Sequence, residues 1–435
     1  MIRLMDARVL GAEAVVRALD RPPSAVPEAI TTAVAQILDG VRARGDAALL
    51  EYTARFDRFA APSAASLAIG AEELGAAERA LPADVRAALA YAAERIERYH
   101  AAALPKSWRM TDEHGSILGQ EVRPLDRVGI YIPGGRAAYP STVLMTAIPA
   151  RVAGVREIVL VTPPAADGSV QPAVLAAARV AGVTEGYRLG GAQAVAALAY
   201  GTASIRRVDK IVGPGNIYVA LAKARVFGEV GIDMVAGPSE VVVVADGAAD
   251  PAWIAADLLA QAEHDPMARA VLLTDAPALV PRVQEALARQ LERLPRRAIA
   301  AEALAANGAL VLVESLDAAV ELANRLAPEH LELMVAVPAA LLPRVRHAGA
   351  IFLGAHTPEV VGDYVAGPNH VLPTAGTARF ASPLGAEDFV KRSSVIEYSP
   401  SGLAAALPHL VALSRIEGLT AHGHAAEVRT KERQA

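Results

Sequence analysis

The fold class follows from three apolar runs, Val128-Gly-Ile-Tyr-Ile132, Glu157-Ile-Val-Leu-Val161 and Val241-Val-Val-Val-Ala245. Two further runs of the same kind are Ala270-Val-Leu-Leu-Thr274 and Ala309-Leu-Val-Leu-Val313. Ala-rich stretches with helical character separate them. Strands that are apolar throughout are buried on both faces, as in parallel sheets covered by helices. The sequence therefore predicts an α/β protein with two doubly wound, incomplete Rossmann-like parallel-sheet domains.

Helical periodicity dominates the chain before the first of these runs. Between residues 28 and 100, apolar residues recur at spacings of three and four, as at Ile30, Val34 and Ile37. This is the pattern of helices with one buried face. Gly45 is placed to end the first helix, and Pro105 follows the last one. We therefore predict a helical N-terminal region that serves mostly as scaffold.

The predicted domain boundaries follow these changes in pattern. We expect an N-terminal extension at 1–25, a larger α/β domain made of 26–128 together with 238–381, and a second α/β domain at 129–237. The strand pattern then ends, which leaves 382–435 as a small helical C-terminal domain. A tail of this size is too small to fold alone, so we expect it to dock on another surface.

Composition narrows the functional classes. The chain has 435 residues, 53% of them hydrophobic, yet it contains no apolar run of membrane-spanning length and no signal-peptide core at its start. We therefore expect a cytoplasmic protein without a membrane span. The absence of cysteine excludes disulfides and a covalent thioester route. With a net charge of −5 and 4% aromatic residues, the sequence shows neither the excess of basic residues nor the aromatic content that nucleic-acid binding favours. We therefore expect a small-molecule substrate.

Four turns rich in glycine lie beside the apolar runs. They read Ile132-Pro-Gly-Gly135, Leu189-Gly-Gly-Ala-Gln193, Val212-Gly-Pro-Gly-Asn216 and Ala236-Gly-Pro-Ser-Glu240. None is a GxGxxG or a Walker sequence, and any single one is compatible with an ordinary connection. Because strand ends in such folds direct backbone amides toward a ligand, the set indicates an atypical dinucleotide crevice in the second domain.

Four other patches carry metal and proton chemistry: Gln261-Ala-Glu-His264, Pro328-Glu-His330, Gly362-Asp-Tyr364 and Glu417-Gly-Leu-Thr-Ala-His422. Together they offer imidazole, carboxylate and amide donors for one divalent cation, with a Glu-His pair to move protons. Asp250-Pro251 favours the start of a helix that runs to the first patch, whose donors, three apart, then share a face. Without cysteine, such a site is catalytic rather than structural. Taken singly, such patterns are more typical of buried histidines that bind nothing.

Seven phrases resemble the motifs of the histidinol dehydrogenases, in the same order and spacing. They are Gly129-Ile-Tyr-Ile-Pro-Gly-Gly135, Gly213-Pro-Gly-Asn216, Ala236-Gly-Pro-Ser-Glu240, Gln261-Ala-Glu-His264, Ala327-Pro-Glu-His-Leu-Glu332, Gly367-Pro-Asn-His-Val-Leu-Pro373 and Glu417-Gly-Leu-Thr-Ala-His422. The resemblance extends over essentially the whole chain. It implies oxidation of L-histidinol through the aldehyde to L-histidine, the last steps of histidine biosynthesis, with NAD as oxidant and one zinc ion per subunit.

The resemblance also implies roles for individual residues. The zinc ligands would be Gln261, His264, Asp363 and His422. His330 would accept protons in both oxidations, and Glu329 would activate water for the second.

The implied binding residues form two sets. Histidinol would contact Ser239, Gln261, His264, His330, Asp363, Glu417 and His422. NAD would contact Tyr131, Gln193 and Asn216. Members of the family are homodimers whose C-terminal tail crosses to the partner, so each active site here would be shared between subunits and would take His422 from the other chain.

Three other functions are compatible with these residues. A dehydrogenase of the same superfamily would act on another small polar alcohol, such as a sulfonated diol. A zinc hydrolase would use Glu329 to activate water on an ester or amide, and a non-catalytic metal-binding protein would use the donors alone. Ser239 and Glu417 favour histidinol, since a carboxylate in a desolvated pocket selects a cationic substrate.

Overall fold

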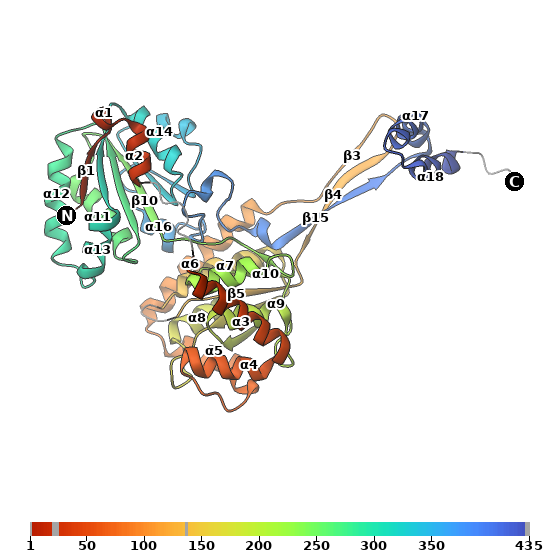
Figure 1. The fold of residues 1–435 in the computed structure, drawn as a ribbon, viewed down its shortest axis with the longest axis horizontal. Coiled ribbons are helices and arrows are strands. Elements are labelled where there is room, and N and C mark those ends of the chain that lie inside the picture. The colour runs from red at the N-terminus through yellow and green to blue at the C-terminus, as the bar shows by residue number, and fades with distance from the viewer. Residues whose placement is uncertain (1, 20–25, 135–137, 431–435) are drawn as a thin grey trace.

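The computed structural model describes residues 2–19, 26–134 and 138–430. Figure 1 shows two α/β domains and a narrow arm that leaves them and ends in a pair of helices. Gly135 of the first glycine-rich turn, together with parts of the predicted N-terminal extension and C-terminal domain, falls outside the described residues.

The first domain is built on a six-stranded parallel sheet. Its strands lie in the order β1 (Arg3–Asp6), β12 (Ala309–Leu312), β11 (Arg269–Thr274), β10 (Glu240–Ala245), β13 (His330–Met334) and β14 (Ala350–Leu353). One face packs against α11 (Pro251–Ala262), α12 (Leu279–Leu291) and α13 (Arg297–Asn307), and the other against α2 (Ala12–Leu19) and α14 (Leu316–Leu326). Strands β10 and β11 are buried along their whole length, as their continuous apolar sequence predicts.

The second domain has a sheet of its own, also six-stranded. The order is β2 (Ala68–Ile69), β7 (Glu185–Arg188), β6 (Glu157–Thr162), β5 (Arg127–Tyr131), β8 (Lys210–Val212) and β9 (Gly231–Ile232), with only β2 antiparallel to its neighbour among these described strands. One face packs against α3 (Glu28–Arg44), α4 (Asp46–Tyr52), α9 (Gly191–Tyr200) and α10 (Ile217–Val226). The other packs against α5 (Ala71–Ala80), α6 (Ala83–Ala103), α7 (Pro140–Ala153) and α8 (Pro172–Ala181).

The arm is a three-stranded antiparallel sheet, made of β3 (Trp108–Thr111), β4 (Ile117–Pro124) and β15 (Val390–Glu397). Helices α17 (Pro400–Ile416) and α18 (Thr420–Thr430) follow at its tip (Figure 1). A hydrogen bond of 2.7 Å from the Ser399 hydroxyl to the His114 carbonyl ties the start of α17 to the turn between β3 and β4. The C-terminal helices therefore lie at the far end of the arm.

Shorter elements complete the chain. They are α1 (Ala7–Leu10), η1 (Thr53–Asp57), η2 (Ala64–Leu67), α15 (Pro338–Leu341), η3 (Leu342–Arg344), α16 (Glu359–Tyr364), η4 (Thr377–Arg379) and η5 (Ala386–Phe389). In the part of the chain that the structure describes, no helix combines the length and the apolar content needed to cross a membrane.

The predicted fold class is confirmed, but the predicted domain boundaries need three corrections. The helices of residues 28–103 pack on the second sheet, not on the first as we expected from 26–128. Strand β1 makes the predicted extension an edge of the first sheet. The predicted helical domain at 382–435 includes β15, and Phe389 just before it is buried in the second domain's core. Helical periodicity shows that a helix has a buried face but not which of two sheets covers that face.

Candidate functional site

The candidate site lies where the strands of the first sheet begin. His330 is the first residue of β13, Glu329 precedes it, and Ser239 directly precedes β10. Helix α11 runs antiparallel to these strands and ends beside the same edge. Ligands in open α/β sheets usually bind at the carboxyl ends of the strands, so the reactive groups of this domain lie at the opposite edge from the usual one.

A loop of the first domain brings this edge against the second domain. The ring of His370 lies 2.9 Å from the Asp363 carbonyl through Nδ1 and 3.2 Å from the Thr142 hydroxyl of α7 through Nε2. The Asn369 amide donates to the Met145 carbonyl, also on α7, at 2.6 Å. The amino edge of the first sheet thus faces the end of the second domain where β5 leads into α7.

His330 is held as a neutral base. Its Nδ1 lies 3.1 Å from the backbone carbonyl of Glu240, and because a carbonyl oxygen can only accept, Nδ1 carries the hydrogen and Nε2 keeps a free lone pair. Burial lowers the pKa of His330 to about 4, although the hydrogen bond to Glu240 acts in the other direction. Nε2 is buried, has no hydrogen-bond partner among the described residues, and lies 3.9 Å from the Asp363 carboxylate.

Glu329 lies beside this base, and hydrogen bonds fix the position of its carboxylate. One of its oxygens accepts from the backbone N–H of Glu240 at 2.9 Å, and the Ser239 side chain is a second hydrogen-bond partner. Burial raises the pKa of Glu329 well above its ordinary value, and the nearby carboxylates of Glu240 and Asp363 add to this rise. The site can therefore bind a cation, whose charge would offset these carboxylates.

Three of the predicted metal donors converge on this edge. As predicted, Asp250 caps α11 with Pro251 in the first turn, but the helix ends at Ala262, so that His264 lies just beyond it rather than on its face. Burial lowers the pKa of His264 and raises that of Asp363 to about 6. The His264 imidazole is also near enough to lower the pKa of His330.

The predicted fourth donor lies elsewhere in the chain. His422 belongs to α18 and Glu417 caps α17, and both side chains are exposed at the tip of the arm. Across the described residues, no group of three or more His, Cys, Asp and Glu side chains is arranged to hold a metal ion. The structure therefore brings Gln261, His264 and Asp363 to one edge and leaves His422 and Glu417 apart from them.

The predicted cofactor residues lie at the carboxyl ends of the second sheet. Tyr131 ends β5, and its hydroxyl accepts from the backbone N–H of Gly191 at 3.1 Å. The Gln193 amide donates to the Asp57 carboxylate at 3.1 Å. The side-chain oxygen of Asn216 caps α10 by accepting hydrogen bonds from two backbone N–H groups at 3.0 and 3.2 Å. The amide nitrogen of Asn216 takes no part in this cap.

A buried ion pair supports the turn before Asn216. Lys223 donates to the Gly213 carbonyl and Asp233 accepts from the Gly213 N–H, both at 2.8 Å, while the two side chains pair with each other. Gly213 has a φ of +109°, and a Cβ atom there would collide with the Tyr131 carbonyl. Only glycine fits this position.

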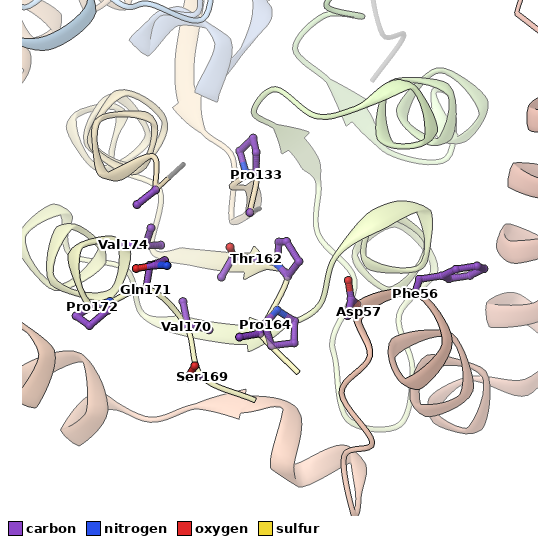
Figure 2. Close-up of a pocket in the computed structure, with 14 residues that line it drawn as sticks. Phe56, Asp57, Pro133, Thr162, Pro164, Ser169, Val170, Gln171, Pro172 and Val174 are labelled. Atoms are coloured by element: carbon purple, nitrogen blue, oxygen red, sulfur yellow. The ribbon is translucent and has the colours of Figure 1, made fainter. Parts of the chain in front are cut away.

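A hollow of about 520 Å³ opens beside these residues, between the ends of β5 and β6 and the start of α8 (Figure 2). Its lining is formed by Phe56, Asp57, Pro133, Gly134, Ala138, Thr162, Pro163, Pro164, Ala165, Ser169, Val170, Gln171, Pro172 and Val174. Asp57 was not among the predicted site residues, because nothing in the sequence around it connects it to strands a hundred residues later.

Two more buried groups near His330 were missed. Glu240 forms a buried ion pair with Arg269 and presents its backbone to both Glu329 and His330. Glu359 Oε2 lies 3.8 Å from His330 Nδ1 and accepts no hydrogen bond from the described residues. Glu240 belongs to a motif that the sequence already singled out, whereas no sequence signal marks Glu359.

Two α/β domains that face each other, a buried base at one sheet edge and a crevice at the strand ends of the other are the parts of a nucleotide-linked dehydrogenase. The family model described as histidinol dehydrogenase matches residues 20–430. The chain belongs to the histidinol dehydrogenase family, and it is therefore an oxidoreductase of histidine biosynthesis.

The sequences of individual relatives match this chain over nearly its whole length. Histidinol dehydrogenase of Chromobacterium violaceum is 58% identical over 405 residues, which cover 93% of each chain. That of Geobacter sulfurreducens is 51% identical and covers 99% of this chain and 100% of the relative. The crystal structure of histidinol dehydrogenase from Elizabethkingia anophelis is 34% identical, has a TM-score of 0.95, and covers 100% of this chain and 99% of that one.

Proposed function

We propose that the protein oxidises L-histidinol through L-histidinaldehyde to L-histidine, with NAD as hydride acceptor and one zinc ion per subunit. One observation carries this proposal: the His330 imidazole is neutral and buried beside Glu329, and its Nε2, on the side of Asp363, has no hydrogen-bond partner among the described residues. A free base surrounded by buried polar groups fits a substrate hydroxyl.

The donor set fits zinc. In the part of the chain that the structure describes, neither the oxygen nor the nitrogen of the buried Gln261 amide has a hydrogen-bond partner, which costs about 1–3 kcal/mol unless a ligand engages the amide. Burial lowers the pKa of His264, which favours the neutral form that binds a metal. Imidazoles combined with oxygen donors suit an open, catalytic zinc site. We infer that Gln261, His264 and Asp363 would hold the ion together with His422 of the partner subunit.

The first oxidation uses His330 as its base. Zinc, when bound, supplies a Lewis acid that polarises the substrate hydroxyl. His330 Nε2 takes the hydroxyl proton while the hydride leaves the carbinol carbon for NAD. As the imidazolium forms, the Nδ1 hydrogen bond to the Glu240 carbonyl becomes charge-assisted and stabilises it.

The second oxidation requires water. The backbone N–H of Glu240 and the Ser239 side chain orient Glu329, which accepts a proton from water as the oxygen adds to the aldehyde carbon. As the oxygen adds, His330 returns its first proton to the aldehyde oxygen and becomes neutral again. It can then remove a proton from the resulting hydrate while a second hydride leaves for a second NAD, and the carboxylic acid that forms ionises. One water is consumed, and the product is a carboxylate.

We place NAD along the carboxyl ends of β5, β6 and β8, in contact with Tyr131, Gln193 and Asn216. The free amide nitrogen of Asn216 lies at the start of α10, where the helix dipole favours a phosphate. The contact of His370 with Thr142 holds this end of the second domain against the edge that carries His330. A dinucleotide lying there can extend its nicotinamide toward the substrate.

We also propose a homodimer in which each tail completes the partner's site. Leu413 and Ile416 on α17 are 62% and 81% exposed, and an apolar helix pair of this kind is stable when another surface covers it. Docking would bring Glu417 to the substrate's cationic amine or imidazole and His422 to the zinc.

NADH formation from L-histidinol, followed at the NADH absorbance band, tests the proposal. We expect two NADH per histidinol consumed, loss of activity on chelation and recovery on addition of zinc. Metal analysis that finds no zinc in active protein would contradict the metal assignment. Oxidation of a sulfonated diol in place of histidinol would contradict the substrate.

A further inference from the structure

The second domain lacks an acidic residue at the place where nucleotide-binding sheets usually carry one. In such sheets, an Asp or Glu near the end of the second strand accepts a hydrogen bond from the ribose 2′-hydroxyl of NAD. Here that strand is β6, which ends at Thr162 and continues as Pro163-Pro164-Ala165. The next acid, Asp167, is exposed and accepts from the backbone N–H and the hydroxyl of Ser169, at 2.9 and 2.6 Å.

Asp57 brings a carboxylate to this place from a distant segment. It ends η1, and the left-handed Arg58, with a φ of +60°, turns the chain after it. Its Oδ2 accepts from the Gly190 N–H at 3.3 Å and from the Gln193 amide at 3.1 Å. A Cβ atom built on Gly190 would lie 2.5 Å from Asp57 Oδ1 and 2.6 Å from Pro163 Cβ. The carboxylate therefore lies close to the residue that follows β6.

Among the residues that the structure describes, no cationic side chain lines the cavity beside Asp57. Asp57 is the only ionisable side chain among the described residues that line the cavity (Figure 2). The guanidinium of Arg55 lies over the Phe56 ring, 5.0 Å from its centroid. Arg188 donates to the Gly168 carbonyl at 2.7 Å and pairs with Glu73. A phosphate on the ribose would meet a carboxylate without an opposing charge from these arginines.

We propose that Asp57 binds the ribose diol of the adenosine and thereby makes the enzyme select NAD over NADP. This rests on the proposed function, in which NAD occupies the crevice. Among the described residues only Oδ2 accepts hydrogen bonds, so Oδ1 is available for a ribose hydroxyl while Gly190 and Gln193 fix the carboxylate. A 2′-phosphate would remove the donor and add a repulsive charge, which disfavours NADP twice.

The test compares kcat/KM for NAD and for NADP in wild type and in Asp57→Asn. The substitution keeps the shape of the side chain and removes its charge. We expect the NAD-to-NADP ratio to fall by about ten- to a hundredfold, the scale of a hydrogen bond to a charged group, through a higher KM for NAD and a lower KM for NADP. Asp167→Asn is the matched control, since it removes a nearby carboxylate that does not line the cavity, and its ratio should equal that of wild type.

A second variant separates the possible failures. Asn216→Ser keeps the cap of α10 but removes the amide, so it should raise the KM for NAD if NAD lies in this crevice. A raised KM in Asn216→Ser with an unchanged ratio in Asp57→Asn would overturn the role of Asp57 alone. Unchanged values in both variants would overturn the placement of NAD.

A wild-type measurement covers the case in which Asp57→Asn does not fold. Adenosine 5′-phosphate and adenosine 2′,5′-bisphosphate are compared as inhibitors competitive with NAD. We expect the first to inhibit at a lower concentration. Stronger or equal inhibition by the bisphosphate would overturn the proposal.

Discussion

Lys223→Met should destabilise the second domain by removing one half of the ion pair beneath the cofactor turn. The side chains of Lys223 and Asp233 are 3% and 0% exposed, and between them they engage both the carbonyl and the N–H of Gly213. The substitution therefore leaves a buried carboxylate without its counter-charge and a buried carbonyl without its donor. Breaking one side of such a pair costs about 3–5 kcal/mol.

The loss is large enough to measure by calorimetry. In a domain of about 200 residues, each kcal/mol lowers Tm by about 2–4 °C, so the transition of this domain should fall by about 6–20 °C. The KM for NAD should rise as well, because Asn216 follows Gly213 in the same turn. Arg179→Met is the matched control: its ion pair with Glu78 spans 4.0 Å with side chains 59% and 40% exposed, and such a pair contributes at most about 1 kcal/mol. Equal Tm shifts in the two variants would refute the reasoning.

Three further predictions concern the site. Glu329→Gln should slow aldehyde oxidation more than alcohol oxidation, whereas His330→Asn should slow both, because only the second step needs activated water; equal losses of the two half-reactions in Glu329→Gln, assayed with histidinol and histidinaldehyde, would contradict this. Coexpressed His264→Ala and His422→Ala chains should recover roughly a quarter of wild-type activity, since half of randomly mixed dimers are hybrids with one intact site of two; purified hybrids without activity would show that the tail serves its own chain. Burial raises the pKa of Asp57 from 3.8 to about 6, so its folded form binds the proton more tightly than the unfolded chain, and stability present below the unfolded value is lost as pH rises through the folded one. The Tm of Asp57→Asn relative to wild type should therefore increase between pH 4 and pH 7, and a pH-independent difference would rule this out.

Local sequence patterns predicted the strands well because the apolar residues of each strand themselves indicate that it is buried. The run Val241–Ala245 lies within β10, and 270–274 within β11. The cap of α11 at Asp250 is equally local. Patterns of this kind depend on neighbouring residues, which the sequence displays directly.

Features that depend on contacts between distant segments were not predicted. No spacing indicates that Asp57 reaches the Gly190 turn, or that the helices of residues 28–103 cover the second sheet and not the first. The site residues were found through motif resemblance, but their position at the starting edge of β13 was not. The sequence also gave no sign that residues 390–397 pair with β4, since that strand is largely exposed and lacks an apolar run.

The pairing of β15 with β4 has a consequence for how the protein is made. These strands lie far apart in the chain, with Ile396 opposite Leu118, so the arm cannot close while the ribosome is still producing the second half of the polypeptide. Both α/β sheets include strands that are translated earlier and can begin to collapse first. The tip helices are presented in their final position only after release of the nascent chain. If two subunits do exchange tails, they must meet as finished chains, and the supply of active enzyme then follows the encounter rate of free subunits as well as the rate of translation.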